Sequence, residues 1–209
     1  MTAMFPLQSA LLPGETLPLM IFEPRYSRLV QDCLAADDPA FGVVLISQGR
    51  EVGGGETRSA VGTLAHIVEC VDLGEGQYQL LASIRERFRV TEWLPDDPYP
   101  RAVVEEWPDE PGPPVGPERI GEVVDGILGL FGKVIEARGG RLRPDALAVD
   151  AATADDPSRH VYALASSVPM GQADRYAVLA APTLAERVDV LTDAIETVTA
   201  MVEFQLSGE

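Results

Sequence analysis

The spacing of apolar residues differs between the first and the second half of this 209-residue chain. Before residue 107, apolar residues gather in short segments rich in Val, Ile, Phe, Tyr and Thr, and Gly-rich or acidic turns separate them. Such segments are typical of β-strands. After residue 117, apolar residues recur every three or four positions, which is typical of helices that bury one face. The sequence therefore predicts an α+β protein whose strands precede most of its helices.

The strand-rich part predicts a small barrel. Its strand segments are 41–46, 60–71, 78–93 and 101–107. Glycines at 53–55 mark a flexible tip, and the turn at 73–76 is typical of a hairpin connection. Several strands at this spacing have edges that closure of the sheet would hide. We therefore expect a closed or nearly closed β-barrel within residues 1–107.

One helix is predicted inside this part, near residues 24–36. A turn at Pro13 and Gly14 leads into a short apolar run that ends at Glu23. Proline is favoured in the first turn of a helix, and Pro24 would occupy that position. We expect this helix to lie on a core, because one face collects its apolar residues. Those residues are Tyr26, Leu29, Val30, Cys33 and Leu34.

A change in composition at residue 108 marks a boundary. Residues 108–117 are rich in proline and glycine and cannot continue a strand, so they predict a linker. Residues 118–209 then predict a helical bundle, packed on or beside the barrel. Its helices are expected over 120–135, from Asp156 and Pro157 onward, near 174–179, and from Thr183 to the end of the chain.

The net charge narrows the choice of partners. The chain has 33 acidic and 16 basic residues, which gives a formal charge of −17, and Lys133 is its single lysine. A sequence-independent nucleic-acid binder needs a basic surface. The densest basic cluster is Arg85, Arg87 and Arg89, whose spacing places them on one face of a predicted strand. We interpret that face as a solvated outer surface, so the sequence disfavours nucleic acid as a partner.

No membrane segment or export signal is predicted. The first ten residues carry no charged side chain and reach Pro6 early, and the chain has no apolar run long enough to span a bilayer. Cys33 and Cys70 each lie in an apolar segment, which predicts buried free thiols instead of a disulfide. Together these features predict a cytoplasmic protein without membrane association.

No catalytic, metal or cofactor motif is complete in this sequence. Residues 126–133 resemble a phosphate-binding loop, but Val134 stands where Ser or Thr is needed, so small residues that allow close helix contact are the better explanation. His66 and Cys70 would share one face of a strand, yet they lack further metal ligands. We interpret His66 as a hydrogen-bonded barrel histidine, and we predict no enzyme activity, no metal and no cofactor.

Several segments resemble the N-terminal domain of Lon proteases, most of all in the stand-alone bacterial proteins that consist of that domain. The resemblance is specific over about the first hundred residues and looser after Pro117. The matching segments are 13–26 (PGETLPLMIFEPRY), 41–45 (FGVVL), 61–67 (VGTLAHI), 87–89 (RFR), 100–105 (PRAVVE) and 187–191 (RVDVL).

The resemblance implies a PUA-like pseudo-barrel followed by a helical bundle. It also implies a non-catalytic domain. In full-length Lon this domain helps to recognise protein substrates and to assemble the ring, whereas the ATPase and the Ser-Lys peptidase lie further along the chain. We therefore expect a module that binds proteins or unfolded polypeptide segments through a cleft between barrel and helices, for proteolysis or quality control by a separate protease. An oligomer is compatible with that role.

Two alternatives to this function stay open. PUA-like barrels elsewhere bind RNA, so an RNA-binding or small-ligand module is the first, and an enzyme without a recognisable motif is the second. For Glu23 and Arg25, a buried ion pair and an exposed contact both remain open. The candidate partner-binding residues are Glu23, Arg25, Arg85, Arg87 and Arg89.

Most of the other signature residues are expected to be structural. Phe22 and Tyr26 are predicted core anchors, because large aromatic side chains contribute most when they are buried. Gly42 and Gly62 are predicted to permit tight packing of strands. The sequence therefore does not identify the binding surface.

Overall fold

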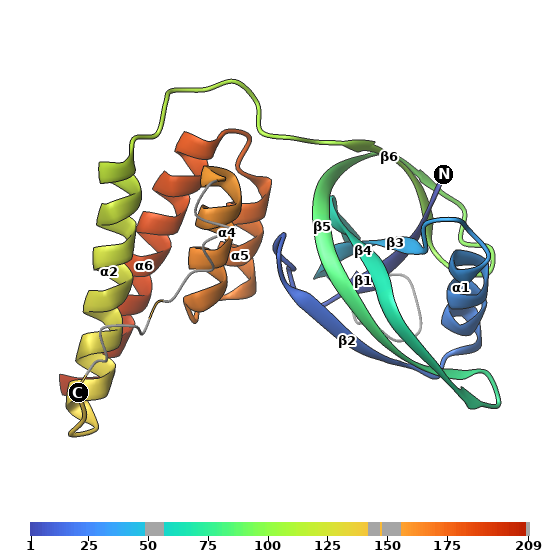
Figure 1. Cartoon of the computed structure of the whole chain (residues 1–209), viewed down its shortest axis with the longest axis horizontal. Coiled ribbons are helices and arrows are strands. Elements are labelled where there is room, and N and C mark those ends of the chain that lie inside the picture. Colours follow the sequence, from blue (N-terminus) through green and yellow to red (C-terminus); the bar gives the residue numbers. More distant parts are fainter. Residues whose placement is uncertain (49–56, 142–146, 148–155, 208–209) are drawn as a thin grey trace. The chain divides into compact units, whose positions relative to one another are not determined.

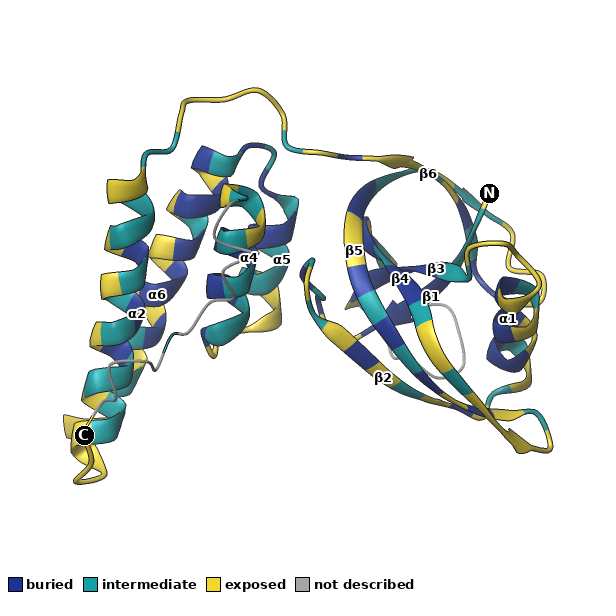
Figure 2. Ribbon diagram, viewed as in Figure 1, coloured by how far each residue is buried: buried dark blue, intermediate teal, exposed yellow. Residues whose placement is uncertain are grey.

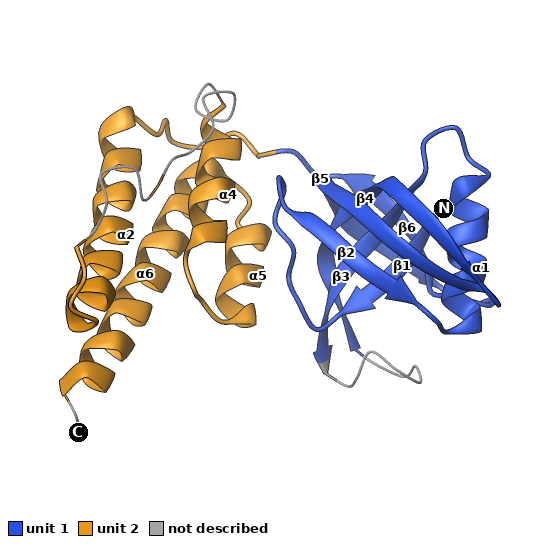
Figure 3. Ribbon diagram, turned by 60° about the horizontal axis from the view of Figure 1, so that its bottom comes forward, with its two compact units in different colours: residues 1–108 blue, residues 109–209 orange. Residues whose placement is uncertain are grey.

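The computed structural model describes residues 1–48, 57–141, 147 and 156–207, which form two compact units (Figures 1 and 3). Unit 1 is Met1–Pro108 and unit 2 is Asp109–Glu209. Strands followed by helices confirm the predicted α+β class, and the glycine tip predicted at 53–55 lies outside the described residues. The elements are β1 (Thr2–Leu7), β2 (Thr16–Ile21), α1 (Pro24–Leu34), β3 (Ala40–Gln48), β4 (Thr57–Gly74), β5 (Gln77–Leu94), β6 (Arg101–Glu106), α2 (Pro117–Ala137), α4 (Pro157–Ser167), α5 (Gln172–Ala180) and α6 (Leu184–Ser207).

The strands of unit 1 form one sheet that closes into a ring. The strand order is β2-β5-β4-β3-β1-β6, and β6 also pairs with β5, so β5, β4, β3, β1 and β6 surround a common interior. β1 and β3 are parallel, and the other pairs are antiparallel. β2 pairs with the first half of the long strand β5, and β6 pairs with the second half. This ring confirms the expected pseudo-barrel, although the sequence did not predict β1.

Two glycines let the strands meet around one aromatic ring inside the barrel. A Cβ atom on Gly62 would lie 2.2 Å from the Val43 carbonyl oxygen and 2.7 Å from the Phe88 ring. A Cβ atom on Gly42 would lie 2.6 Å from the Met4 sulfur. Real Cβ atoms cannot approach so closely, because interiors are already packed at crystal density. The predicted tight strand packing at both glycines is therefore confirmed.

Helix α1 covers a second cluster of buried side chains on the outside of the ring. Its first residue is Pro24, as predicted, and its buried residues include Tyr26, whose ring centroid lies 4.1 Å from that of Phe5. Two predictions about this region were wrong. Leu34 is exposed because it is the last residue of the helix, and Phe22 is 63% exposed because it lies between β2 and α1 and points away from the core.

Helices α2 and α6 run parallel to each other in unit 2. One ion pair joins Arg119 of α2 to Asp189 of α6, near the start of both helices. A second ion pair joins Lys133 to Glu203, and each of these residues lies 14 positions after its counterpart in the first pair. Equal spacing along both helices requires the same direction. The shorter helices α4 and α5 pack against α6. At the start of α4, the Asp156 carboxylate accepts hydrogen bonds from two backbone N–H groups, which confirms the predicted cap.

The glycines of α2 do not all serve close helix contact. A Cβ atom on Gly126 would make an ordinary contact of 3.4 Å with Ile195 of α6. A Cβ atom on Gly129 or Gly132 would have no neighbour within 4 Å. The prediction of close packing was therefore wrong for Gly129 and Gly132, because these two positions face away from the neighbouring helix.

A buried arginine organises the start of α6. Arg187 is fully buried, and its guanidinium pairs with both carboxylate oxygens of Asp109, donates to the Ser158 hydroxyl at 2.8 Å and lies 4.1 Å from the Tyr162 ring centroid. The Glu110 N–H also donates to the Pro182 carbonyl at 2.9 Å. The first residues of the predicted linker are thus bonded within unit 2.

Replacing Gly62 with alanine should destabilise unit 1 by about 3 kcal/mol, because the added methyl group meets the backbone of β3. Urea unfolding followed by tryptophan fluorescence measures this, since the two tryptophans, Trp93 and Trp107, are both in unit 1. The matched control is Gly129→Ala, which adds the same methyl group to open space in a helix of unit 2 and should leave the urea midpoint of unit 1 unchanged. A Gly62→Ala protein with the wild-type urea midpoint would contradict the close approach.

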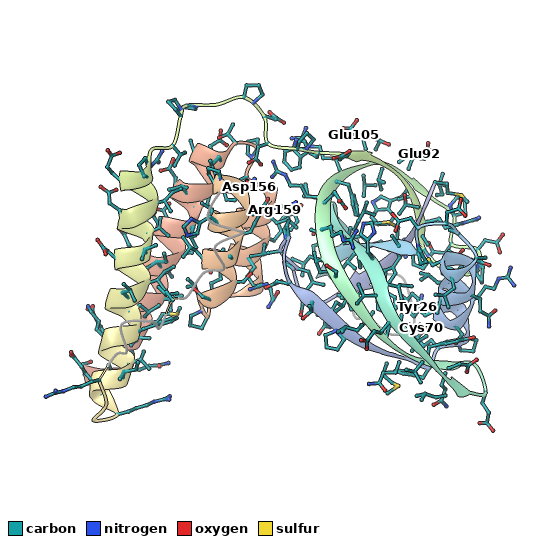
Figure 4. The ribbon with its side chains drawn as sticks, in the orientation of Figure 1. Tyr26, Cys70, Glu92, Glu105, Asp156 and Arg159 are labelled. Carbon is teal, nitrogen blue, oxygen red and sulfur yellow. The ribbon has the colours of Figure 1, made fainter. Side chains whose placement is uncertain are left out.

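Replacing Arg187 with methionine should lower the unfolding free energy of unit 2 by about 3–5 kcal/mol, because Asp109 loses its partner in a poorly solvated site. Urea unfolding followed by the helical circular dichroism signal measures this loss. Arg159→Met is the control, since Arg159 pairs with Asp156 in the same unit with a mostly exposed side chain (Figure 4). That change should cost no more than about 1 kcal/mol. Equal losses in the two variants would show that the Arg187 network contributes no more than a surface pair.

Candidate functional site

The outer face of β2, β5 and β4 carries large apolar side chains in contact with solvent. Met20 is 53% exposed and Phe22 63%, and Val71 and Leu73 of β4 are about as exposed. The strand register places Met20 and Val71 on either side of Gln79 in β5, so these three residues form one row across the sheet. We call Met20, Phe22, Val71 and Leu73 the outer apolar face.

The local sequence explains why β2 has two different faces. Leu17 and Ile21 are buried against the core, whereas Pro18 and Met20 between them are exposed, so the side chains alternate along the strand (Figure 2). The exposed residues Pro18 and Met20 are apolar as well. In the sequence, such a run of apolar residues cannot be distinguished from a strand that is buried on both faces. For that reason sequence reasoning assigned Phe22 to the core and missed the outer apolar face.

The arginines of β5 do not share one solvated face. Arg85 is exposed, but Arg87 is buried, because β5 holds one extra residue between Ile84 and Arg87 opposite β4. The guanidinium of Arg87 lies 4.1 Å from the Trp107 ring centroid, and its Nε donates to the Trp107 carbonyl at 2.8 Å. Arg89 lies 3.6 Å from the same ring centroid. The interpretation of a solvated arginine face was therefore wrong, and two of the three arginines fix the end of unit 1.

Glu23 and Arg25 form a partly buried ion pair. Arg25 Nε lies 3.0 Å from Glu23 Oε2, and the two side chains are 18% and 21% exposed. The guanidinium of Arg25 also lies 4.4 Å from the Tyr26 ring centroid. The Glu23 carbonyl accepts hydrogen bonds from the backbone N–H groups of Tyr26 and Ser27 at the start of α1. Both residues thus have a structural task at the junction of β2 and α1.

His66 is held by two carboxylates, as expected for a hydrogen-bonded barrel histidine. Its Nδ1 lies 3.1 Å from Asp38 and its Nε2 lies 3.0 Å from Glu86. Cys70 does not share its face, because the extra residue Val68 reverses the alternation of β4, and Cys70 packs toward the core instead. Within the described residues, no group of three or more His, Cys, Asp or Glu side chains could hold a metal ion.

Three titratable groups of unit 1, Cys33, Cys70 and Tyr99, have a raised pKa. Burial and, to a smaller degree, the Asp32 carboxylate raise the pKa of the Cys33 thiol to about 11. Burial also raises the pKa of Cys70, with a smaller effect of Asp72. Burial and a hydrogen bond of 2.8 Å from its hydroxyl to Asp32 raise the pKa of Tyr99 to about 12. None of these groups has the lowered pKa of an activated nucleophile.

The phosphate-loop-like motif of the sequence has no support in the structure. Residues 126–133, which resemble a phosphate-binding loop, lie inside α2 and not between a strand and a helix start. The described helices also include none that is both long and apolar enough to cross a membrane. The predicted cleft between barrel and helices involves both units and stays a prediction.

Comparison with known proteins relates the chain to parts of longer proteases. It is 34% identical to Lon protease 2 of Myxococcus xanthus over 98 residues, which is 46% of this chain and 12% of that protein. It is 30% identical to Lon protease 2 of Sorangium cellulosum (strain So ce56) over 129 residues, which is 59% of this chain and 16% of that protein. The matched region is therefore a small part of these relatives.

Solved structures match over nearly the whole chain. The Lon N-terminal domain protein from Xanthomonas campestris is 27% identical, with a TM-score of 0.64, and the match covers 92% of this chain and 96% of that one. The N-terminal domain of a Mycobacterium avium complex Lon protease has the same fold, with a TM-score of 0.59 at 14% identity, and the match covers 93% of this chain and 97% of that one. The family described as ATP-dependent protease La (LON) substrate-binding domain matches residues 2–197. With this match over most of its length, the chain belongs to the Lon substrate-binding domain family.

Proposed function

We propose that this chain is a non-catalytic module that binds apolar, unfolded segments of other proteins on the outer apolar face. The observation that carries the proposal is the solvent exposure of four large apolar side chains, of which Met20 and Val71 lie in one row of the sheet, Phe22 directly follows β2, and Leu73 lies two residues beyond Val71 in β4. Contiguous apolar surface on a soluble protein typically marks an interaction site. Membership of a substrate-binding domain family supports a polypeptide as the ligand.

The expected affinity of such a face is low. Covering one half-exposed large apolar side chain gains about 1 kcal/mol, and the four side chains together gain about 4 kcal/mol. That free energy corresponds to a dissociation constant of about 1 mM before further contacts are added. A weak, sequence-tolerant contact suits a module that has to accept many unfolded segments and release them again.

The purpose that we propose for this binding is proteolysis or quality control by a separate protease. The relatives named Lon protease support a link to proteolysis, because the matched region is part of proteins that carry that name. A cytoplasmic location and assembly into oligomers remain predictions of the sequence.

The structure offers less support for the alternative of RNA binding. A basic platform would need Arg85, Arg87 and Arg89 at the surface together. Arg87 is buried, and both Arg87 and Arg89 lie against the Trp107 ring. We therefore keep Glu23, Arg25, Arg87 and Arg89 as structural residues in this proposal and place no partner contact on them.

The double substitution Met20→Thr and Phe22→Thr should weaken binding of an unfolded polypeptide up to about thirtyfold, because it removes two of the four side chains of the outer apolar face, about 2 kcal/mol. A reduced, carboxymethylated protein that cannot refold serves as the ligand, and isothermal titration calorimetry measures its affinity. Because both side chains are exposed, the urea midpoint of unit 1 should change little.

Val103→Thr provides the matched control for this experiment. Val103 is an exposed apolar residue of β6, in the same unit but outside the outer apolar face. Its substitution should leave the affinity unchanged. Equal affinity of the wild-type protein and the double variant would exclude the outer apolar face as the binding surface.

The thiols should behave as structural groups and not as nucleophiles. Since burial raises the pKa of Cys33 from 9.0 to about 11, its thiolate is scarce at pH 8 and increases only as the pH approaches 11. Ellman's reagent at pH 8 should therefore label Cys33 only after urea unfolds the protein. The Cys70→Ser variant isolates Cys33 for this measurement, and rapid labelling of its folded form would contradict a buried thiol.

A further inference from the structure

We propose that the polypeptide ligand docks as an extended strand on the open edge of β2 and lays its apolar side chains beside Met20 and Phe22. This proposal rests on the proposed function and adds the mode of recognition. The ligand class is an extended peptide whose main chain forms the hydrogen bonds, so that few side chains are specified.

β2 is the edge strand of the sheet in unit 1. It pairs with β5 from Thr16 to Ile21, and no other strand of the described residues pairs with it (Figure 3). An edge strand presents a row of backbone N–H and C=O groups that another extended chain can pair with. The last strand in the sheet order, β6, has no comparable open edge, since it closes the ring by pairing with both β1 and β5.

The hydrogen bonds at the start of β2 show which backbone groups face outward. The Gly14 N–H donates to the Ile84 carbonyl at 2.9 Å, and the Ile84 N–H donates to the Glu15 carbonyl at 2.9 Å. In an antiparallel pair, every second residue forms hydrogen bonds to the partner strand. Counting from Ile84, the residues of β5 that bond to β2 are therefore Ala82, Leu80 and Tyr78. Their register partners Leu17, Leu19 and Ile21 therefore bond to β5. The backbone groups of Thr16, Pro18 and Met20 consequently point away from β5.

Pro18 agrees with this assignment and limits the length of the site. Proline has no N–H and is tolerated in sheets where the missing donor would face solvent. Its outward position interrupts the row of donors in the middle of β2, which disfavours the growth of a long sheet between copies of the chain. The N–H and C=O groups of Thr16 and Met20 and the C=O of Pro18 remain for pairing. A docked segment therefore makes only a few main-chain hydrogen bonds, next to the most exposed apolar side chains of β2.

The side chains beside this edge favour an apolar segment with some positive charge. An added strand would lie about 4.8 Å from β2, with every second side chain on the same face as Met20. Glu69 is exposed on β4 in the same row as Pro18, across Leu81 of β5. With a formal charge of −17 on the whole chain, lysines that flank the apolar part of a peptide gain attraction.

The test uses a peptide of about twelve residues in which leucine and threonine alternate between terminal lysines. A second peptide has the same side chains but N-methyl groups on every backbone nitrogen, which removes its backbone N–H donors and keeps the charged lysine side chains. We expect the unmodified peptide to bind at least about tenfold more tightly by calorimetry, because each missing main-chain hydrogen bond weakens the complex. We also expect binding to slow the hydrogen exchange of the Met20 amide measured by NMR. This comparison leaves the protein unchanged, so no variant has to fold.

A pair of variants tests the same edge from the protein side. Met20→Ala removes most of the side chain and keeps the backbone N–H. Met20→Pro also removes the backbone N–H, which points away from β5, so no hydrogen bond between β2 and β5 is lost. The proline variant should bind the unmodified peptide about tenfold more weakly than the alanine variant. Equal binding of both peptides, or of both variants, would overturn the docked strand and leave the outer apolar face as the site. Absence of any binding to the wild-type protein would overturn the proposed function together with this inference.

Discussion

The approach of β3, β4 and β5 around the Phe88 ring is the constraint on which the architecture of unit 1 depends. The missing side chains of Gly42 and Gly62 let these strands come close enough to enclose the ring, and Met4 of β1 completes the contact from the opposite side. Once the ring is closed through the pairing of β5 with β6, the first half of β5 is left to pair with a strand outside it. That strand is β2. Closure of the barrel and the open edge of β2 are therefore two consequences of the same packing.

Two buried arginines hold the chain on either side of the boundary between the units. Arg87 lies against the Trp107 ring and bonds to the Trp107 carbonyl, whereas Arg187 pairs with Asp109. Each guanidinium also stacks on an aromatic ring, which compensates part of the cost of burying its charge. Each unit thus fixes its own end of the chain with its own network. The outer apolar face uses none of these residues, so substitutions in the proposed binding surface leave both networks intact.

The sequence predicted the elements whose signals are local. Pro24 began α1 and Asp156 capped α4, because proline geometry and capping depend only on neighbouring residues. The sequence did not predict β1. Both faces of this strand are buried, because Met4 faces the barrel interior and Phe5 faces the cluster under α1, so its residues do not alternate between apolar and polar. Arg87 and Cys70 were placed on the wrong faces because bulges shift the alternation of β5 and β4, and a bulge depends on pairing between distant segments. Phe22 was assigned to the core for a related reason, since hydrophobicity alone does not tell which side of a sheet is covered.

A substrate-binding module gains from a site built of backbone groups and a few apolar side chains. Main-chain hydrogen bonds are available in every extended polypeptide, so they select for the unfolded state and not for a sequence. The apolar side chains beside the edge then select segments that a folded protein would bury, which is the property that separates a damaged chain from an intact one. In the docked strand that we propose, Pro18 would keep the number of hydrogen bonds small, so that the complex would be weak enough to dissociate. Weak capture by one domain becomes effective when several such contacts act together, because linked sites raise the local concentration of the bound segment.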